Sequence, residues 1–281
     1  MILDELAIDQ REAFCLDLAR SAAILALDGF ERQAGQPIGM KGPQDYLTET
    51  DGAVERHVRA RIAKAFPSDG FLGEETGGTP GDIAWVVDPI DGTANFARSI
   101  PHFCISIAFV TSGEVQLGAI LNPATDELYF ARKGRGATRN GKAIHVAPTT
   151  DLQATSFELG WSNRVPLSRY IQSLTALFEA GSNVRRSASG AMALAYVADG
   201  RTDGYAELHM NSWDCLAGLL LVREAGGVTC AFLSLGGLID GAPVLAASPA
   251  VAAVLATATG IPIFPGADIL PAPTLTTLRT A

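Results

Sequence analysis

The 281-residue sequence lacks the marks of several large protein classes. It has 21 Lys and Arg against 30 Asp and Glu, so it lacks the basic surface that nucleic acids and anionic membranes require. Its four cysteines show no C-x-x-C spacing, which disfavours a structural zinc site or a disulfide framework. The N-terminus is acidic, unlike a signal peptide, and no apolar run is long enough to span a bilayer. We expect a soluble, cytoplasmic protein that binds neither nucleic acid nor membranes.

Common catalytic motifs are missing as well. The sequence contains no G-x-S-x-G, which disfavours a serine hydrolase, and no H-E-x-x-H. The segment GATRNGKA has the spacing of a P-loop, but Ala143 occupies the position where Ser or Thr must reach magnesium. Its Asn140-Gly141 pair predicts a hairpin turn instead.

The two halves of the chain show different patterns. The first half predicts helices packed on an antiparallel sheet, and the second predicts a mixed sheet with alternating helices. A small polar stretch near Pro148 separates them, so we expect an N-terminal α+β domain (1–148) and a C-terminal α/β domain (149–281) with a loosely held tail. The predicted helices are 3–30, 51–66, 169–180, 190–199, 214–226 and 249–259, and the predicted strands are 84–87, 104–110, 115–121, 127–131, 156–160, 203–206, 228–232 and 244–247.

One stretch, WVVDPIDGTANF, ends an apolar run in two aspartates, Asp88 and Asp91. Pro89 restricts the backbone and Gly92 permits a sharp turn, so the two carboxylates are held close together. Like charges at short distance repel unless a cation lies between them. With the carbonyl of Ile90 and a nearby hydroxyl, they form an oxygen-rich set suited to magnesium. An aspartate-rich turn that only caps the next segment is the alternative.

Three further acidic residues also lie at the end of an apolar segment. Glu74 comes after a short apolar stretch, Asp214 opens an apolar helix, and Asp51 lies at the start of another. Taken singly, each has a plain explanation as a solvated turn or a helix cap. Together they place carboxylates at the ends of apolar segments, which in a layered fold gather in one crevice. Such a cluster requires metal ions, with two favoured over one because of the excess negative charge, and indicates attack of water on a phosphate ester.

These segments resemble the inositol monophosphatase family of magnesium-dependent, lithium-sensitive phosphatases. WVVDPIDGTANF and WDCLAG carry the resemblance, supported by KGPQDYLTETD, GEE, GRGATRNGK and SASGAMALAYVADG. The resemblance covers residues 41–227 and implies a layered α-β-α-β-α sandwich of the sugar-phosphatase type. It also implies two or three Mg²⁺ ions, a small phosphorylated alcohol as substrate, and a homodimer.

The resemblance further assigns roles to individual residues. Glu74, Asp88, the Ile90 carbonyl and Thr93 would surround the first magnesium, and Asp88, Asp91 and Asp214 would hold the second. Asp51, with Thr93 and Glu74, would take part in activating the attacking water. The substrate-binding residues would be Asp91, Gly92, Thr93, Ser189, Gly190, Ala191, Glu207 and Asp214, with Lys41 flanking the site.

The expected reaction is hydrolysis of a small phosphomonoester, with myo-inositol monophosphate as the favoured substrate. Histidinol phosphate, fructose 1,6-bisphosphate and an adenosine bisphosphate are alternatives on the same scaffold. An inactive protein that binds a metal or a phosphorylated ligand is an alternative of another class. The chain departs from the family at Cys215, which we expect near the acidic site, where its oxidation would affect activity.

Overall fold

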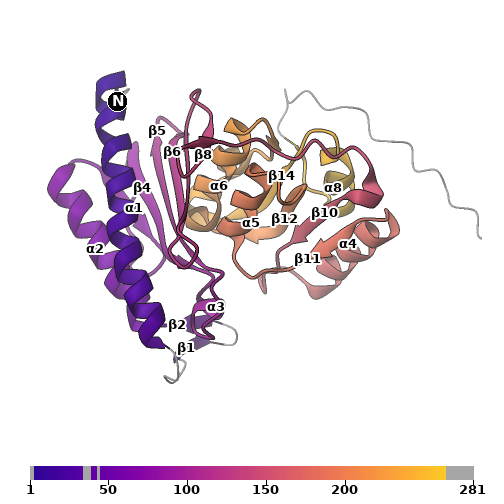
Figure 1. Ribbon diagram of the computed structural model, residues 1–281, viewed down its shortest axis with the longest axis horizontal. Helices are drawn as coiled ribbons and strands as arrows, with labels where there is room; N and C mark the ends of the chain where they lie inside the picture. Colours follow the sequence, from indigo (N-terminus) through magenta and orange to yellow (C-terminus); the bar gives the residue numbers. More distant parts are fainter. Residues whose placement is uncertain (1–2, 34–38, 43–44, 264–281) are drawn as a thin grey trace, which may run out of the picture.

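The computed structural model describes residues 3–33, 39–42 and 45–263 as a stack of five layers (Figure 1). α1 and α2 cover the outer face of a seven-stranded sheet, and α5 and α6 lie between this sheet and a five-stranded sheet. α4 and α8 cover the far face of the second sheet. The helices are α1 (Glu5–Gln33), α2 (Glu49–Ala65), α3 (Thr93–Phe96), α4 (Leu167–Glu179), α5 (Gly190–Ala198), α6 (Ser212–Glu224), α7 (Gly237–Asp240) and α8 (Ala252–Thr259). The predicted α-β-α-β-α sandwich is therefore confirmed.

The seven-stranded sheet has the order β3-β4-β5-β6-β7-β8-β9 and is antiparallel except for the parallel β3–β4 pair. The five-stranded sheet has the order β11-β10-β12-β14-β13 and is mixed, as predicted. A separate pair, β1 (Gly39–Gly42) and β2 (Asp45–Leu47), precedes α2. The other strands are β3 (Gly70–Gly73), β4 (Ile83–Asp91), β5 (Cys104–Thr111), β6 (Glu114–Asn122), β7 (Glu127–Arg132), β8 (Ala137–Arg139), β9 (Lys142–Ala143), β10 (Ser156–Leu159), β11 (Asn183–Arg185), β12 (Gly204–Met210), β13 (Val228–Thr229) and β14 (Ala242–Ala247).

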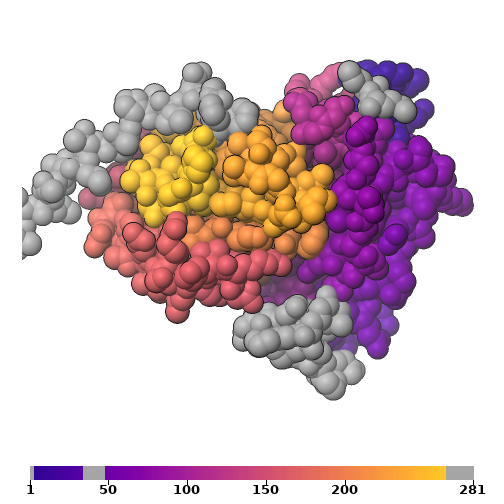
Figure 2. Space-filling model, turned by 180° about the vertical axis from the view of Figure 1, so that it is seen from behind, coloured from indigo at the N-terminus to yellow at the C-terminus, as the bar shows by residue number. Residues whose placement is uncertain are grey.

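The two sheets share a hydrophobic core. One cluster of buried residues includes Val86 and Ile120 of the first sheet, Leu194 of α5, and Val244 of the second sheet. A second cluster lies under α1 and α2. The buried sandwich helices are apolar on all sides, as expected for helices enclosed by two sheets. Figure 2 shows the orange C-terminal segment directly against the purple N-terminal one.

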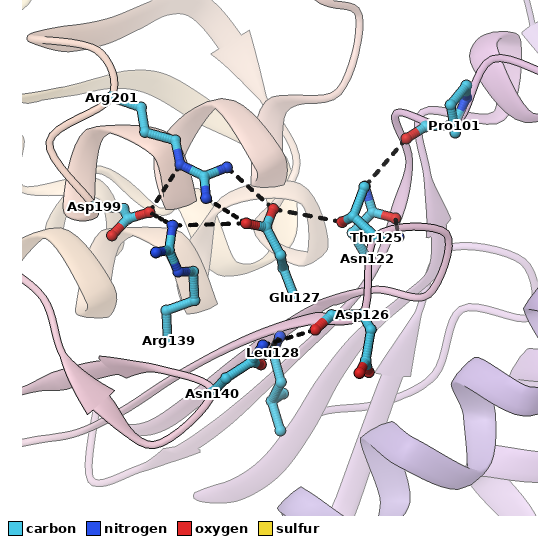
Figure 3. A network of polar contacts seen from close by, with 10 residues as sticks. All are labelled: Pro101, Asn122, Thr125, Asp126, Glu127, Leu128, Arg139, Asn140, Asp199 and Arg201. Carbon is cyan, nitrogen blue, oxygen red and sulfur yellow. Dashed lines mark hydrogen bonds and ion pairs between the residues drawn. The ribbon is translucent and has the colours of Figure 1, made fainter.

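An ion-pair network also joins the two halves (Figure 3). Glu127 on β7 accepts hydrogen bonds from Arg201, just after α5, and Arg201 contacts Asp199 at 2.9 Å. Arg139 on β8 pairs with the same two carboxylates. The C-terminal end of α5 is thereby tied to the first sheet, which is relevant because the other end of α5 reaches the acidic site.

The structure extends two predicted strands, β4 to Asp91 and β12 to Met210, and adds short strands that were not predicted. β3, β8, β9 and β11 have two to four residues each, too few for a periodic pattern to appear. The predicted hairpin at Asn140-Gly141 does join β8 to β9, with φ of 50° and 76°. The predicted loosely held tail lies outside the described residues. None of the described helices has the length and hydrophobicity needed to cross a membrane.

Candidate active site

Three carboxylates from two distant segments converge at one end of the sandwich helices. Asp88 and Asp91 come from the C-terminal end of β4, where the register against β5 shifts between the two residues. Asp214 lies in the first turn of α6. One carboxylate oxygen from each lies within 4.8 Å of the others, which is a spacing that can hold a metal ion.

Protein donors hold one oxygen of each of these carboxylates. Asp88 Oδ1 accepts the N–H of Ile90 at 2.8 Å, and Asp214 Oδ2 accepts the N–H of Asn211 at 3.2 Å. Asp91 Oδ2 accepts the hydroxyl of Ser189 at 2.6 Å and the N–H of Ala191 at 2.7 Å. These donors fix the orientation of each carboxylate.

The electrostatics of the site favour a bound cation. Burial, with the charge of Asp214 adding to it, raises the pKa of Glu74 to about 8. Burial and the charge of Asp91 raise the pKa of Asp214 to about 7. The pKa of Asp88 is also raised, first by burial and then by Glu74 and Asp91. Hard oxygen donors that repel one another in a buried site are the donor set that Mg²⁺ neutralises, so these residues fit the ion.

A second acidic position lies beside this cluster. Asp51 is fully buried in the first turn of α2, and the Thr93 hydroxyl lies 3.4 Å from its Oδ1 and 3.0 Å from the carbonyl oxygen of Ile90. Burial raises the pKa of Asp51 to about 6, although hydrogen bonds from Thr48 oppose the shift. A carboxylate of this pKa can accept a proton from water near neutral pH.

The helix-capping explanation of these acids is also correct. The sequence suggested that Asp51 and Asp214 are N-cap residues. In the structure each is instead the N3 residue of a capping box, whose N-cap residue is Thr48 or Asn211 respectively. Capping uses one oxygen of each carboxylate, since Asp51 Oδ2 and Asp214 Oδ2 are the acceptors. For Asp51 the other oxygen, Oδ1, lies 3.4 Å from the Thr93 hydroxyl.

The turn after Asp91 requires glycine. Gly92 has φ of 94°, and a side chain there would approach the His102 carbonyl to 3.0 Å and the Ser189 side chain to 3.2 Å. The turn leads into α3, whose first N–H groups have no partners within the helix. Asn95 of α3 then donates to the carbonyl oxygens of His102 and Ser187, which ties the turn to the second half of the chain.

A cavity of about 240 Å³ extends from the carboxylates toward the second sheet. Asp91 and Asp214 lie at one end, and Glu207 of β12 accepts a 2.5 Å hydrogen bond from Tyr205 inside it. Burial raises the pKa of Glu207 to about 8, opposed by the Tyr205 hydroxyl. The cavity is also lined by Ala94, Glu158, Leu159, Gly160, Trp161, Arg186, Ser187, Ala188, Ser189, Gly190 and Met210.

The comparisons with known proteins identify the chain. A model of the inositol monophosphatase family matches residues 8–259. The chain belongs to the inositol monophosphatase family. An inositol-1-monophosphatase of Rhizobium meliloti is 43% identical over 195 residues, which cover 68% of this chain and 73% of that protein. A protein named Nus factor SuhB of Xylella fastidiosa is 41% identical over 218 residues, covering 76% of this chain and 79% of that protein.

Solved structures agree on the fold. A protein from Bartonella henselae titled extragenic suppressor protein suhB superposes with a TM-score of 0.80 at 32% identity, covering 87% of this chain and 96% of that one. The inositol monophosphatase of Anabaena gives a TM-score of 0.76 at 30% identity, covering 91% of this chain and 98% of that one. The relatives are thus divided between enzymes and proteins named for other roles.

The structure brings the predicted site residues into one region. Glu74, Asp88, Asp91 and Asp214 form the acidic cluster, Asp51 and Thr93 lie beside it, and Ser189 and Ala191 contact Asp91 directly. Gly190 and Glu207 line the cavity. The Lys41 side chain lies outside the described residues. Their roles in catalysis and metal binding remain proposals.

Cys215 lies next to Asp214, but its burial argues against the expected sensitivity to oxidation. Its side chain is fully buried and its thiol donates to the Asn211 carbonyl at 3.3 Å. Burial, with the charge of Asp214 adding to it, raises the pKa of the thiol. Because the thiolate is the form that oxidants attack, this environment protects Cys215.

Sequence reasoning missed three buried residues that hold the site loops. Glu55 of α2 accepts the N–H groups of Glu75 and Thr76 at 2.8 Å each, immediately after Glu74. Glu158 of β10 accepts the N–H and hydroxyl of Ser187. Asn95 lies in WVVDPIDGTANF, where no separate role was predicted for it. A charged residue inside an apolar strand, as in SFELG, was the available signal for Glu158.

Proposed function

We propose that this protein hydrolyses a small phosphomonoester, with inositol monophosphate as its preferred substrate, using two Mg²⁺ ions. The observation that carries the proposal is the convergence of Asp88, Asp91 and Asp214, whose ligand oxygens lie within 4.8 Å of one another. The name of the Rhizobium relative supports the substrate. When bound, the ions supply positive charge that activates water and stabilises the leaving alkoxide.

The residues of the chain have separate tasks in this reaction. Asp88, Asp91 and Asp214 would hold one ion, and Glu74, Asp88 and the Ile90 carbonyl would hold the other. Asp51 accepts the proton of the attacking water, and Thr93, placed between Asp51 and Ile90, orients that water. The Gly92–Thr93 turn directs backbone N–H groups to the phosphate oxygens.

The alcohol occupies the far end of the cavity. Glu207 accepts a hydroxyl of the substrate, since its carboxyl is buried and already fixed by Tyr205. Gly160 makes room for this carboxyl, because a side chain at that position would overlap the Glu207 and Tyr205 oxygens. Ser189 and Gly190 also line the cavity, and Ser189 and Ala191 donate to Asp91 at its metal end.

The experiment is a comparison of kcat/KM for inositol monophosphate, histidinol phosphate, fructose 1,6-bisphosphate and an adenosine bisphosphate, each with Mg²⁺ and with EDTA. We expect Mg²⁺-dependent phosphate release that is fastest with inositol monophosphate. A different preferred substrate would replace the substrate assignment only. A folded protein that releases no phosphate from any of them would favour the inactive, ligand-binding alternative.

A further inference from the structure

The structure assigns to Glu158 the task of positioning Asp91, and through it the metal position formed by Asp88, Asp91 and Asp214; this inference rests on the proposed function. Glu158 does not touch these residues. It is 2% exposed on β10, in the second half of the chain, while Asp91 lies at the end of β4. The connection runs through the loop that links β11 to α5.

Hydrogen bonds with two different residues hold this loop at Ser187. Glu158 Oε1 accepts the N–H of Ser187 at 2.8 Å and also its hydroxyl. Asn95, from the turn after Asp91, donates to the carbonyl oxygen of Ser187 at 2.9 Å. The hydrogen-bonding groups of Ser187 are therefore fixed by one residue from each half of the chain.

The residues that follow Ser187 contact Asp91, so the position of Ser187 determines this contact. Ala188 has φ of 62°, a left-handed conformation that is unfavourable for a residue with a side chain. A fixed neighbour is needed to hold such a conformation. The turn at Ala188 directs the Ser189 hydroxyl and the Ala191 N–H onto Asp91 Oδ2, at 2.6 and 2.7 Å. Without the hydrogen bonds from Ser187 to Glu158, the loop relaxes and Asp91 loses the donors that orient it.

Glu55 holds the loop that carries Glu74 in the same way. It is fully buried and accepts two backbone N–H groups of the turn that follows Glu74. The two glutamates come from opposite halves of the chain and reach different ligands. The two metal positions should therefore be separable by changes at residues outside the proposed sets of metal ligands.

The test is calorimetric titration of Mg²⁺ into metal-free protein. Glu158→Leu removes both hydrogen bonds to Ser187 and should weaken one of the two binding events by about 10–100-fold, the usual cost of losing support for a metal ligand. Glu158→Gln keeps an acceptor for Ser187 and should stay within about 3-fold of the wild type. If Glu158→Leu fails to fold, Ser187→Ala removes one of the two hydrogen bonds and should weaken the same event by about 5-fold.

Glu224→Leu is the matched control. Glu224 also accepts two loop N–H groups, those of Gly134 and Gly136, but lies at the opposite end of α6 from Asp214. It should leave both binding events unchanged. Equal effects of Glu158→Leu and Glu224→Leu would overturn the inference, as would a Gln variant as weak as Leu, because charge and not positioning would then matter. Wild-type protein that takes up no Mg²⁺ would overturn the proposed metal sites themselves.

Discussion

The two ends of the cavity differ in how completely their side chains are held, although Glu207 at the alcohol end is fixed by Tyr205. At the metal end, Asp88, Asp91 and Asp214 each accept hydrogen bonds from the backbone. At the alcohol end, Trp161 is only half-buried and Arg186 is exposed. Under the proposed function, the backbone fixes the groups of the chemical step, while the choice of alcohol depends on side chains that are less constrained.

The largest expected effect is at the metal end. Asp91→Asn should lower kcat/KM by more than about 100-fold for every phosphomonoester, because it removes a metal ligand and not merely its support. The variant should remain folded, since asparagine keeps the acceptor for Ser189 and Ala191. Asp126→Asn, in an exposed turn, is the control. Near-normal turnover of Asp91→Asn would contradict the assignment.

A change at the alcohol end should separate substrates. Glu207→Ala should lower kcat/KM for inositol monophosphate by about 10-fold, the cost of losing a buried hydrogen bond to the substrate. For p-nitrophenyl phosphate, whose alcohol has no further hydroxyl, the loss should stay below about 3-fold. Steady-state kinetics on both substrates measure the split. An equal loss on both substrates would mean that Glu207 does not bind a hydroxyl of the alcohol.

The metal end should also control how stability depends on pH. The pKa of Asp214 rises from its ordinary 3.8 to about 7 and that of Glu74 from 4.5 to about 8, so the folded protein binds these protons more tightly than the unfolded chain. Metal-free protein should therefore lose stability as the pH rises from about 4 to 8. Thermal unfolding in EDTA should show Tm falling by several degrees over this range. Saturating Mg²⁺ should remove most of the fall; a pH-independent Tm in EDTA would argue against the acidic cluster.

The smallest expected effect concerns the loop between the two ends. Ala188→Gly relieves the left-handed strain at φ of 62° but adds freedom to the unfolded chain, so the net gain in unfolding free energy should be at most about 1 kcal/mol. Activity should change less than about 2-fold. Denaturant unfolding measures the unfolding free energy, and steady-state kinetics measure the activity. A clear loss of stability would show that the loop is not strained as described.

The sequence predicted the architecture and the acidic cluster better than it predicted what supports them. Long periodic helices and the strands around β5 and β6 were identifiable, as was the carboxylate pair in DPID, because Pro89 and Gly92 mark the strand end. The parallel β3–β4 pair was not, since a four-residue strand has no measurable period.

The supporting residues could not be predicted for a different reason. Glu55 and Glu158 act through backbone N–H groups of loops that lie 20 and 29 positions away. No local pattern encodes such a contact; it exists only once the loops are folded. The burial of Cys215 has the same origin, because the position of α6 between two sheets decides which of its faces meets the cavity.

The most direct test of the account is a Mg²⁺ titration of the metal-free wild type and Asp91→Asn by calorimetry. The wild type should bind at least two ions, and the variant should lose one of these binding events. Wild-type protein that is folded but gives no binding heat at any pH between 6 and 9 would contradict the claim that these carboxylates form a metal site.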